Sequence, residues 1–256
     1  MPEGDTVWRT ARRLDALVGE EVTRFDLRVP RAATADLTGE RVVDSAAHGK
    51  HLLLRIGDLT LHSHLKMEGS WRVFSPGERW RKPAHTARAV VGTAAHEAVG
   101  FDLAEVRLVP TSDEHSLVGH LGPDPLAGDW DPARAAANLQ ADDRAIHVAL
   151  QDQRNVAGFG NEYANEILFV RGILPTTPAS QTDAAATIDL GARMIRANRD
   201  RRDRTFTGDA RPGRTTWVYR REHRPCRRCG TLIVGGALGA DPTRERIVFW
   251  CPTCQR

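Results

Sequence analysis

The chain contains CRRC at 226–229, followed after 21 residues by CPTC at 251–254. Two Cys-x-x-Cys pairs offer four thiolates to one tetrahedral zinc ion, at a separation one residue longer than the usual range. Between them, GTLIVGGALGADPTRERIVFW (230–250) has two apolar runs around a Gly-rich turn, which predicts a β-hairpin. A zinc ion with four protein ligands is structural, because no coordination position stays open. We therefore expect one zinc ion on Cys226, Cys229, Cys251 and Cys254.

Composition supports zinc over the alternatives, which are two disulfides or two redox pairs. The 256 residues are 41% hydrophobic and 27% charged, as in a globular protein of about two domains. No apolar window reaches the length of a membrane helix, and VWRTARRLDAL (7–17) lacks the apolar core of a secretory signal. We expect a cytoplasmic protein, in which cysteines stay reduced.

Charge is spread unevenly along the chain. The formal net charge is +3, yet 13 arginines stand against four acidic residues between Arg193 and Arg228. Such a segment indicates either a surface that meets phosphates or a solvated charged face. Only three of the 36 Lys and Arg residues are lysines, and one of these is Lys50.

Hydrophobic periodicity divides the chain near residue 125. One helix, Thr6–Val18, precedes a series of short strand-like runs, which predicts a β-sandwich. The runs lie at 41–47, 51–56, 59–65, 87–94, 97–103 and 106–110. Gly57-Asp58 between two of them is a hairpin signal. Alanine-rich periodic sequence then predicts helices at Pro132–Gln140 (with Asp131 as the cap), Asp142–Val156, Asn161–Arg171 and Thr182–Arg199.

The stretch NVAGFGNEYANEILF (155–169) opens one of these helices. Gly158 and Gly160 permit tight turns, and we expect Asn161 to cap the helix so that its free amides face outward. A helix N-terminus of this kind suits a phosphate, although a plain helix–turn–helix packing joint has the same pattern.

The opening MPEGDT places a proline beside a glutamate at the N-terminus. If the initiator methionine is removed, Pro2 carries a secondary amine next to the Glu3 carboxylate. An α-amine has a pKa of about 8, against about 10.4 for lysine, so a useful fraction is neutral and can attack an aldehyde-like carbon. Glu3 would supply a proton and Lys50 would hold an anionic substrate. The alternative is a disordered tail and a surface lysine.

Together these motifs resemble the formamidopyrimidine-DNA glycosylase and endonuclease VIII family of bacterial base-excision repair enzymes. The resemblance rests on MPEGDT, Gly49-Lys50, HLKMEGSWRV (64–73), DQRNVAGFGNEYANEILF (152–169) and the two cysteine segments, in order along the whole chain. The PEG opening and the W-R-V after the loop are closer to endonuclease VIII than to the purine-lesion branch.

The resemblance implies an α+β fold of three parts. These are an N-terminal β-sandwich with an N-terminal helix (1–125), a helix–two-turn–helix module (126–215) and a zinc-finger β-hairpin (216–256). DNA would lie in the cleft between the sandwich and the helical module. The partner would be damaged DNA, bound by a monomer associated with the nucleoid, with no membrane.

The resemblance also implies roles for individual residues. Pro2 would attack the anomeric carbon of the sugar, and Glu3 would protonate the ring oxygen. Lys50 would lie at the lesion phosphates. Asn161, in the helix–two-turn–helix joint, and Arg246, in the finger, would bind phosphate.

The implied activity is that of a bifunctional DNA glycosylase and AP lyase. Oxidised pyrimidines are the expected substrates, with strand cleavage by successive β- and δ-elimination through a Schiff base. The alternatives are the same chemistry on oxidised purines, or a non-catalytic zinc-finger DNA-binding protein. The target base must leave the helix, and Met67, flanked by Lys66, would fill the gap or else be a hairpin core residue. The Arg-Arg-Phe void-filling segment of the purine-lesion branch is absent, since the corresponding stretch reads GFDLAEVRL (100–108).

Overall fold

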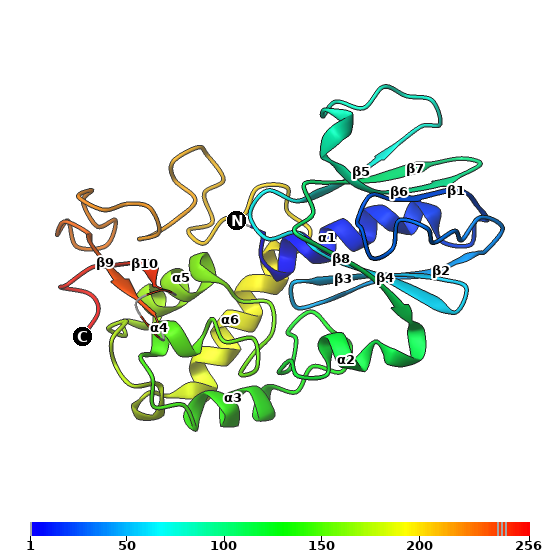
Figure 1. Cartoon of the computed structure of the whole chain (residues 1–256). Coiled ribbons are helices and arrows are strands. Elements are labelled where there is room, and N and C mark those ends of the chain that lie inside the picture. The colour runs from blue at the N-terminus through cyan, green and yellow to red at the C-terminus, as the bar shows by residue number, and fades with distance from the viewer. Residues whose placement is uncertain (1, 240, 242, 244) are drawn as a thin grey trace. The chain divides into compact units, whose positions relative to one another are not determined.

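The structure, a computed structural model, describes residues 2–239, 241, 243 and 245–256 (Figure 1). The chain forms two compact units, of which the first ends at His120 and the second spans Leu121–Arg256. Within the described ranges, no helix combines the length and the apolar character needed to cross a membrane.

The first unit contains two four-stranded antiparallel sheets and one long helix. One sheet has the strand order β1-β6-β7-β5 and the other β2-β3-β4-β8. The strands are β1 (Val22–Leu27), β2 (Val42–His48), β3 (His51–Ile56), β4 (Leu59–His64), β5 (Ser70–Phe74), β6 (Ala87–Thr93), β7 (Glu97–Phe101) and β8 (Glu105–Pro110). Both sheets contribute side chains to a single core, for example Val22, Leu54 and Val91, so the predicted sandwich is confirmed.

Helix α1 (Gly4–Leu14) belongs to this core. Its apolar side chains recur every three or four residues, and Val7, Ala11 and Leu14 are fully buried against the sandwich. The helix packs on β2, β3 and β5. It begins two residues earlier than expected and continues as the 3₁₀ turn η1 (Asp15–Leu17). Val18, the expected last residue of the helix, has an extended backbone. The unit also contains η2 (Ala84–Thr86), η3 (Thr111–Asp113) and α2 (His115–Val118).

The second unit is helical, with a small hairpin at its end. Its helices are α3 (Pro132–Gln140), α4 (Ile146–Ala149), α5 (Asn161–Arg171) and α6 (Ala184–Asn198), with the 3₁₀ turn η4 (Ala179–Gln181). Asp131 caps α3 as expected, because its Oδ1 accepts a bond from the Arg134 amide at 2.9 Å. Helix α5 ends at Gly172, whose φ of +73° is the left-handed conformation that glycine tolerates.

One predicted helix is wrong. The range Asp142–Val156 contains only the single turn α4, and the rest is a series of turns. Short polar side chains compete here with the helical hydrogen bonds. Asp142 and Asp152 accept bonds from the amides of Arg144 and Arg154, and the Asn155 side chain donates to Ala149 O.

The hairpin predicted between the cysteine pairs is present. Strands β9 (Val234–Leu238) and β10 (Arg246–Trp250) pair antiparallel, with Arg246 opposite Leu238. Residues 240, 242 and 244 of the predicted turn lie outside the described residues. The hairpin packs on α5 through a small apolar cluster that includes Phe169, Ile233 and Phe249.

Candidate functional site

The start of the chain is built into the fold. Glu3 is completely buried and Pro2 is half-buried. The Glu3 carbonyl accepts the amides of Thr6 and Val7 at 2.9 and 3.1 Å, which makes Glu3 the N-cap residue of α1. A carboxylate in this position lies in the positive field of the helix N-terminus. Pro2 and Glu3 are therefore held by α1, whereas Met1 lies outside the described residues.

Lys50 lies in the two-residue turn between β2 and β3. His48 and His51 form the last pair of this ladder, which leaves Gly49 and Lys50 at the tip. Gly49 has a φ of +57°, as a tight hairpin turn requires. Lys50 therefore lies at the tip of the hairpin formed by β2 and β3.

The direction of α1 relative to β2 shows which end of the sandwich carries this hairpin. Ser45 Oγ, in the middle of β2, donates to Ala11 O, in the second half of α1, at 3.1 Å. Asp44, near the start of β2, is close to Asp15, at the end of α1. Burial raises the pKa of Asp15, and the negative charge of Asp44 raises it further. Strand β2 therefore runs antiparallel to α1. The end of β2 and the start of α1 consequently lie at the same end of the unit.

His64 closes β4 at this same end, paired with His51. The Lys66 amide donates to His64 Nδ1 at 3.0 Å, so a neutral His64 carries its proton on Nε2. Burial lowers the pKa of His64 to about 4, and the charges of Lys66 and Lys50 contribute to this shift. Both lysines are thus near one neutral imidazole that can donate a hydrogen bond.

The loop after His64 presents Met67 to solvent. Leu65 is buried, Lys66 adopts a left-handed φ of +51°, and Met67 is 56% exposed. Gly69 has no room for a side chain, because a Cβ would lie 2.5 Å from Leu65 O. The turn is therefore tightly built, and Met67 is not a core residue of the hairpin.

Sequence reasoning missed a cluster of histidines, which begins with His51, the residue after Lys50. His51 Nδ1 lies 2.9 Å from His62 Nε2, and the rings of His51 and His120 have centroids 6.3 Å apart. Burial, followed by the neighbouring imidazoles, lowers the pKa of His51 to about 3. The signal available in the sequence was the alternation His62-x-His64, which places both imidazoles on one face of a strand.

In the second unit, Asn161 corrects one expectation. The N-cap of α5 is Gly160, and Asn161 is the first helical residue. Its side chain does not cap the helix, because its Nδ2 donates to Ile247 O at 2.9 Å and its Oδ1 lies 2.9 Å from His147 Nε2. Arg246, the first residue of β10 and the neighbour of Ile247, is exposed. The structure thus brings the Asn161 amide next to the strand that carries Arg246.

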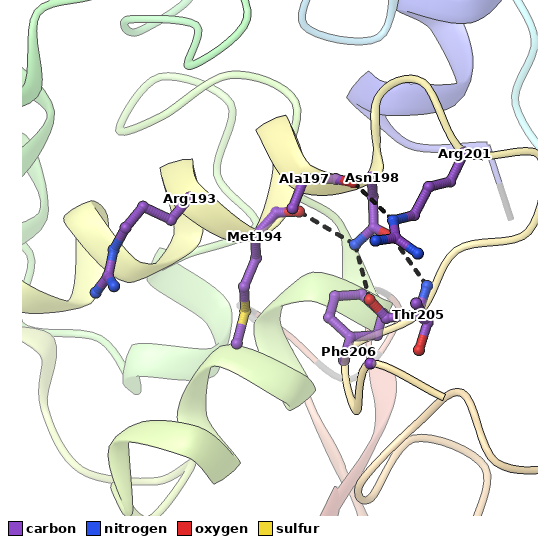
Figure 2. A pocket seen from close by; sticks show the side chains of 8 residues that line it. Arg193, Met194, Ala197, Asn198, Arg201, Thr205 and Phe206 are labelled. Carbon is purple, nitrogen blue, oxygen red and sulfur yellow. Dashed lines mark hydrogen bonds between the residues drawn. The ribbon is translucent and has the colours of Figure 1, made fainter. Parts of the chain in front are cut away.

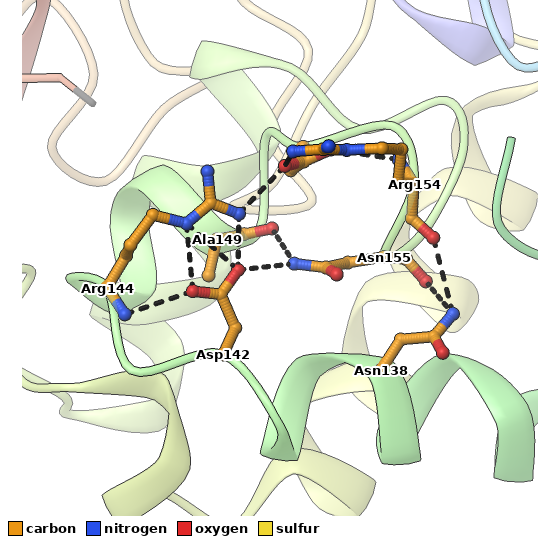
Figure 3. A network of polar contacts seen from close by, with 7 residues as sticks. Asn138, Asp142, Arg144, Ala149, Arg154 and Asn155 are labelled. Atoms are coloured by element: carbon orange, nitrogen blue, oxygen red, sulfur yellow. Dashed lines mark hydrogen bonds and ion pairs between the residues drawn. The ribbon is translucent and has the colours of Figure 1, made fainter. Parts of the chain in front are cut away.

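A polar network fixes the loop that leads into α5 (Figure 3). Arg144 bridges two carboxylates, because its Nη2 contacts Asp142 and lies 2.7 Å from Asp152. Asp152 also accepts Arg154 Nη2 at 2.7 Å, and Asn155 Nδ2 donates to Asp142 at 2.8 Å. Irregular backbone before α5 is therefore held by charge-assisted hydrogen bonds.

We expect Asp152→Asn to lower the free energy of unfolding by about 1–2 kcal/mol at pH 7, a figure reduced for partial solvent screening. The hydrogen bonds from Arg154, then those from Arg144, hold the pKa of Asp152 well below its ordinary value of 3.8. A depressed carboxyl pKa stabilises the fold above the unfolded value and loses that effect as pH falls through the folded value. In urea unfolding, the difference in the free energy of unfolding between the wild type and Asp152→Asn should therefore narrow below pH 4. A pH-independent difference would contradict this account.

The four cysteine sulfurs form one cluster. All four Sγ atoms lie within 4.8 Å of one another, with Cys226 and Cys254 4.0 Å apart and Cys229 and Cys251 3.5 Å apart. None is joined in a disulfide. The cluster can therefore hold a metal ion between the two ends of the hairpin.

A separate hollow of about 280 Å³ lies at the end of α6 (Figure 2). Asn198 shapes it, because its Nδ2 donates to Met194 O and Thr205 O at 3.1 Å and its Oδ1 accepts the Thr205 amide at 2.9 Å. Arg193 and Arg201 line its rim, and Met194 and Phe206 supply apolar surface. The hollow lies within the arginine-rich segment but contains none of the residues predicted as site residues.

Comparison with known proteins gives a consistent result. Residues 121–195 match the model of the formamidopyrimidine-DNA glycosylase H2TH domain. The "Probable endonuclease 8 2" of Streptomyces coelicolor is 52% identical over all of this chain and 94% of its own length. The "DNA-(apurinic or apyrimidinic site) lyase Nei2" of Mycolicibacterium smegmatis is 48% identical over all of this chain and 99% of its own.

Among solved structures, MutM in complex with DNA containing carbocyclic 8-oxo-G is 25% identical, with a TM-score of 0.82 over the full length of both chains. The similarity therefore includes the sandwich, the helical module and the finger. On this evidence, the chain belongs to the formamidopyrimidine-DNA glycosylase and endonuclease VIII family of bacteria, on its endonuclease VIII side.

Proposed function

We propose that this protein is a base-excision repair DNA glycosylase with AP lyase activity that removes oxidised pyrimidines. The observation that carries the proposal is the common placement of Pro2, the buried Glu3 and the Lys50 hairpin at one end of the sandwich. A nucleophile, a proton donor and a cation are what attack on a phosphate-flanked sugar requires.

The proposed reaction begins once Met1 has been removed. The Pro2 nitrogen attacks C1′ of the damaged nucleoside, and the bond between C1′ and the base breaks. Glu3 gives a proton to the ring oxygen, the amine proton leaves with the base, and the opened sugar remains bound as an iminium. The iminium acidifies the C2′ proton, so loss of that proton expels the 3′ phosphate, and a second elimination expels the 5′ phosphate.

The DNA-binding residues divide between the two units. We assign Lys50 and Lys66 to phosphates around the lesion, with the neutral imidazole of His64 as a further donor between them. Asn161 and Arg246 are assigned to phosphates on the second unit. In functional terms, we divide the chain into a catalytic part (1–125), a helix–two-turn–helix part (126–215) and a finger (216–256), acting as a monomer on damaged DNA.

Zinc is the metal that we assign to the four cysteines. A regular tetrahedron with Zn–S bonds of about 2.3 Å has sulfurs about 3.8 Å apart. The Cys229–Cys251 separation of 3.5 Å, the Cys226–Cys254 separation of 4.0 Å and the limit of 4.8 Å for all pairs fit this geometry. Four thiolates and no further ligand make the site structural, so zinc would stabilise the finger and take no part in the chemistry.

Met67 is the residue that we assign to the gap left by the everted base. Its exposure at the tip of a tight turn is what an apolar wedge requires. We propose the preference for pyrimidines from the resemblance to the endonuclease VIII branch, to which the relatives of about 50% identity also belong by name.

Borohydride trapping on a lesion panel tests the proposal. Duplexes with thymine glycol, 8-oxoguanine or a pre-formed abasic site would be incubated with the processed, zinc-loaded protein. We expect a covalent adduct, formed faster on thymine glycol than on 8-oxoguanine. Faster trapping on 8-oxoguanine would assign oxidised purines instead. An absence of adduct on every duplex would leave a zinc-finger DNA-binding protein without catalysis.

For Glu3→Gln, we expect base excision to fall by about 10²–10⁴-fold, the usual contribution of a positioned general acid. Cleavage of a pre-formed abasic site should fall much less, because the base is already gone and the cyclic hemiacetal of that sugar opens to the aldehyde without help from the enzyme. Single-turnover assays on the two substrates measure the difference. Equal losses on both would indicate that Glu3 serves the fold or the elimination steps instead.

A further inference from the structure

A buried polar cluster connects α4 and α5 to the finger strand. His147 and Asn165 are 0% exposed and Asn161 is 7% exposed. We propose that His147 is a positioning residue, which orients the Asn161 amide so that Asn161 and Arg246 are presented to DNA as a pair at a fixed spacing. This inference rests on the proposed phosphate roles of Asn161 and Arg246.

The hydrogen-bond chemistry determines where the proton of His147 lies. Asn161 Oδ1 can only accept, so His147 Nε2, at 2.9 Å, must donate to it. His147 Nδ1 is then the unprotonated ring nitrogen, and Gln151 Nε2, which donates to His147 O at 2.8 Å, lies 3.3 Å from both ring nitrogens. Asn165 Nδ2 donates to Asn161 O at 2.7 Å and approaches Oδ1 at 3.2 Å. Burial lowers the pKa of His147 to about 4, so the neutral form persists at neutral pH.

This arrangement determines which way the Asn161 amide points. With Oδ1 held by His147 and Asn165, Nδ2 must turn toward β10, where it donates to Ile247 O at 2.9 Å. An amide nitrogen carries two hydrogens, so Nδ2 can give the second to a phosphate oxygen. Reversal of the amide would place a donor against the Nε2–H and an acceptor against the Ile247 carbonyl.

The same helix contacts β10 at a second point. Asn165 Oδ1 accepts the Phe249 amide at 2.6 Å, two residues beyond Ile247. Two asparagines one helical turn apart therefore bind alternate backbone groups of one strand edge. Arg246 immediately precedes this segment and is exposed. The position of its backbone thus depends on the amide that His147 orients.

The test uses two amides that replace different ring nitrogens. The nitrogen of an asparagine side chain takes the place of Nδ1, whereas that of glutamine takes the place of Nε2. His147→Asn therefore removes the donor to Asn161, and His147→Gln retains one. Leu139→Ala, at another fully buried position of the same unit, controls for loss of stability.

Binding of the full-length, zinc-loaded protein to a duplex with a non-cleavable abasic analogue would be measured by fluorescence anisotropy between 50 and 200 mM salt. Arg246→Gln should reduce the slope of log K against log salt by about 0.9, equal to about a 3.5-fold change in relative affinity across this range. His147→Asn should reduce the slope equally, and the double variant should show no further reduction. KM for abasic-site cleavage should rise while kcat stays within about twofold.

The outcomes separate a positioning role from a structural one. His147→Gln should restore the slope, and Leu139→Ala should lower Tm without changing it. If the two substitutions reduced the slope additively in the double variant, or if His147→Asn left the slope unchanged, the positioning role of His147 would be wrong. The proposed phosphate role of Arg246 would stand in either case. An unchanged slope in Arg246→Gln would overturn both the proposed phosphate role of Arg246 and the inference. If His147→Asn does not fold, failure of His147→Gln to keep the wild-type slope overturns the inference.

Discussion

The Pro2→Gly protein is expected to form the borohydride-trapped adduct at least about a hundredfold more slowly, which corresponds to about 2.7 kcal/mol of barrier. The secondary amine of proline gives an iminium that is permanently cationic. The imine of glycine must first be protonated before it withdraws electrons.

Binding provides the control for this variant. Affinity for a duplex with a non-cleavable abasic analogue should stay within about threefold, since position 2 contributes chemistry and not phosphate contacts. Mass spectrometry would show whether Met1 has been removed. Full activity in protein that retains Met1, or undiminished trapping by Pro2→Gly, would contradict the assignment of Pro2 as the nucleophile.

Cys251→Ser is expected to reduce DNA affinity by about 10–100-fold, or about 1.4–2.7 kcal/mol. Cys251 is fully buried in the four-sulfur cluster, and loss of one ligand couples to unfolding of the finger. Unfolding of the hairpin would remove Arg246 and release Ile247 from Asn161. The salt dependence of binding should weaken in parallel, because fewer cations contact phosphate.

Thr253→Ser, an exposed substitution between two ligands, is the matched control and should retain both metal and affinity. Metal content by mass spectrometry under native conditions would accompany the binding assay. Cys251→Ser protein that contains no metal yet binds damaged DNA normally would show that the finger does not contribute to the complex.

The elements that the sequence predicted well are those marked by local chemistry. Strand β3 and helices α3 and α5 agree with prediction residue for residue. Each is bounded by a residue with a strong local preference, such as Gly57 after β3, Asp131 before α3 and Gly172 after α5. Local signals of this kind operate without help from the rest of the chain.

The errors arise where a periodic pattern is not enough. The helix expected at Asp142–Val156 has adequate periodicity, but Asp152 and Asn155 use their side chains to bind groups eight and six residues earlier in the segment, which turns the backbone out of the helix. Strands β1 and β5 were not predicted, because their short, mixed sequences become strands only when they pair with β6 and β7. Pairing partners of this kind are not visible in a local window.

In the candidate site, too, local motifs can be found in the sequence, whereas the contacts between them cannot. Sequence motifs identified Asn161 and Arg246 separately, but nothing in the sequence connects them through Ile247 or places His147 beside them. A lone histidine on a short apolar segment is usually a core residue. The role that we propose for it depends on a 2.9 Å contact with a residue 14 positions later.

Helix α5 has a consequence for protein engineering. Glu166 is fully buried, and its two carboxylate oxygens accept the amides of Trp217, Val218 and Tyr219 at 2.8–2.9 Å. Burial raises the pKa of Glu166 to about 7, because a charged carboxylate is unfavourable inside the protein. The hydrogen bonds from the three amides act in the opposite direction and stabilise the charged form. With Asn165 at Phe249, the helix thus supplies part of the finger's own hydrogen bonding. A chimera that transplants residues 216–256 onto a foreign scaffold should be poorly ordered even with zinc, unless α5 is transplanted with them.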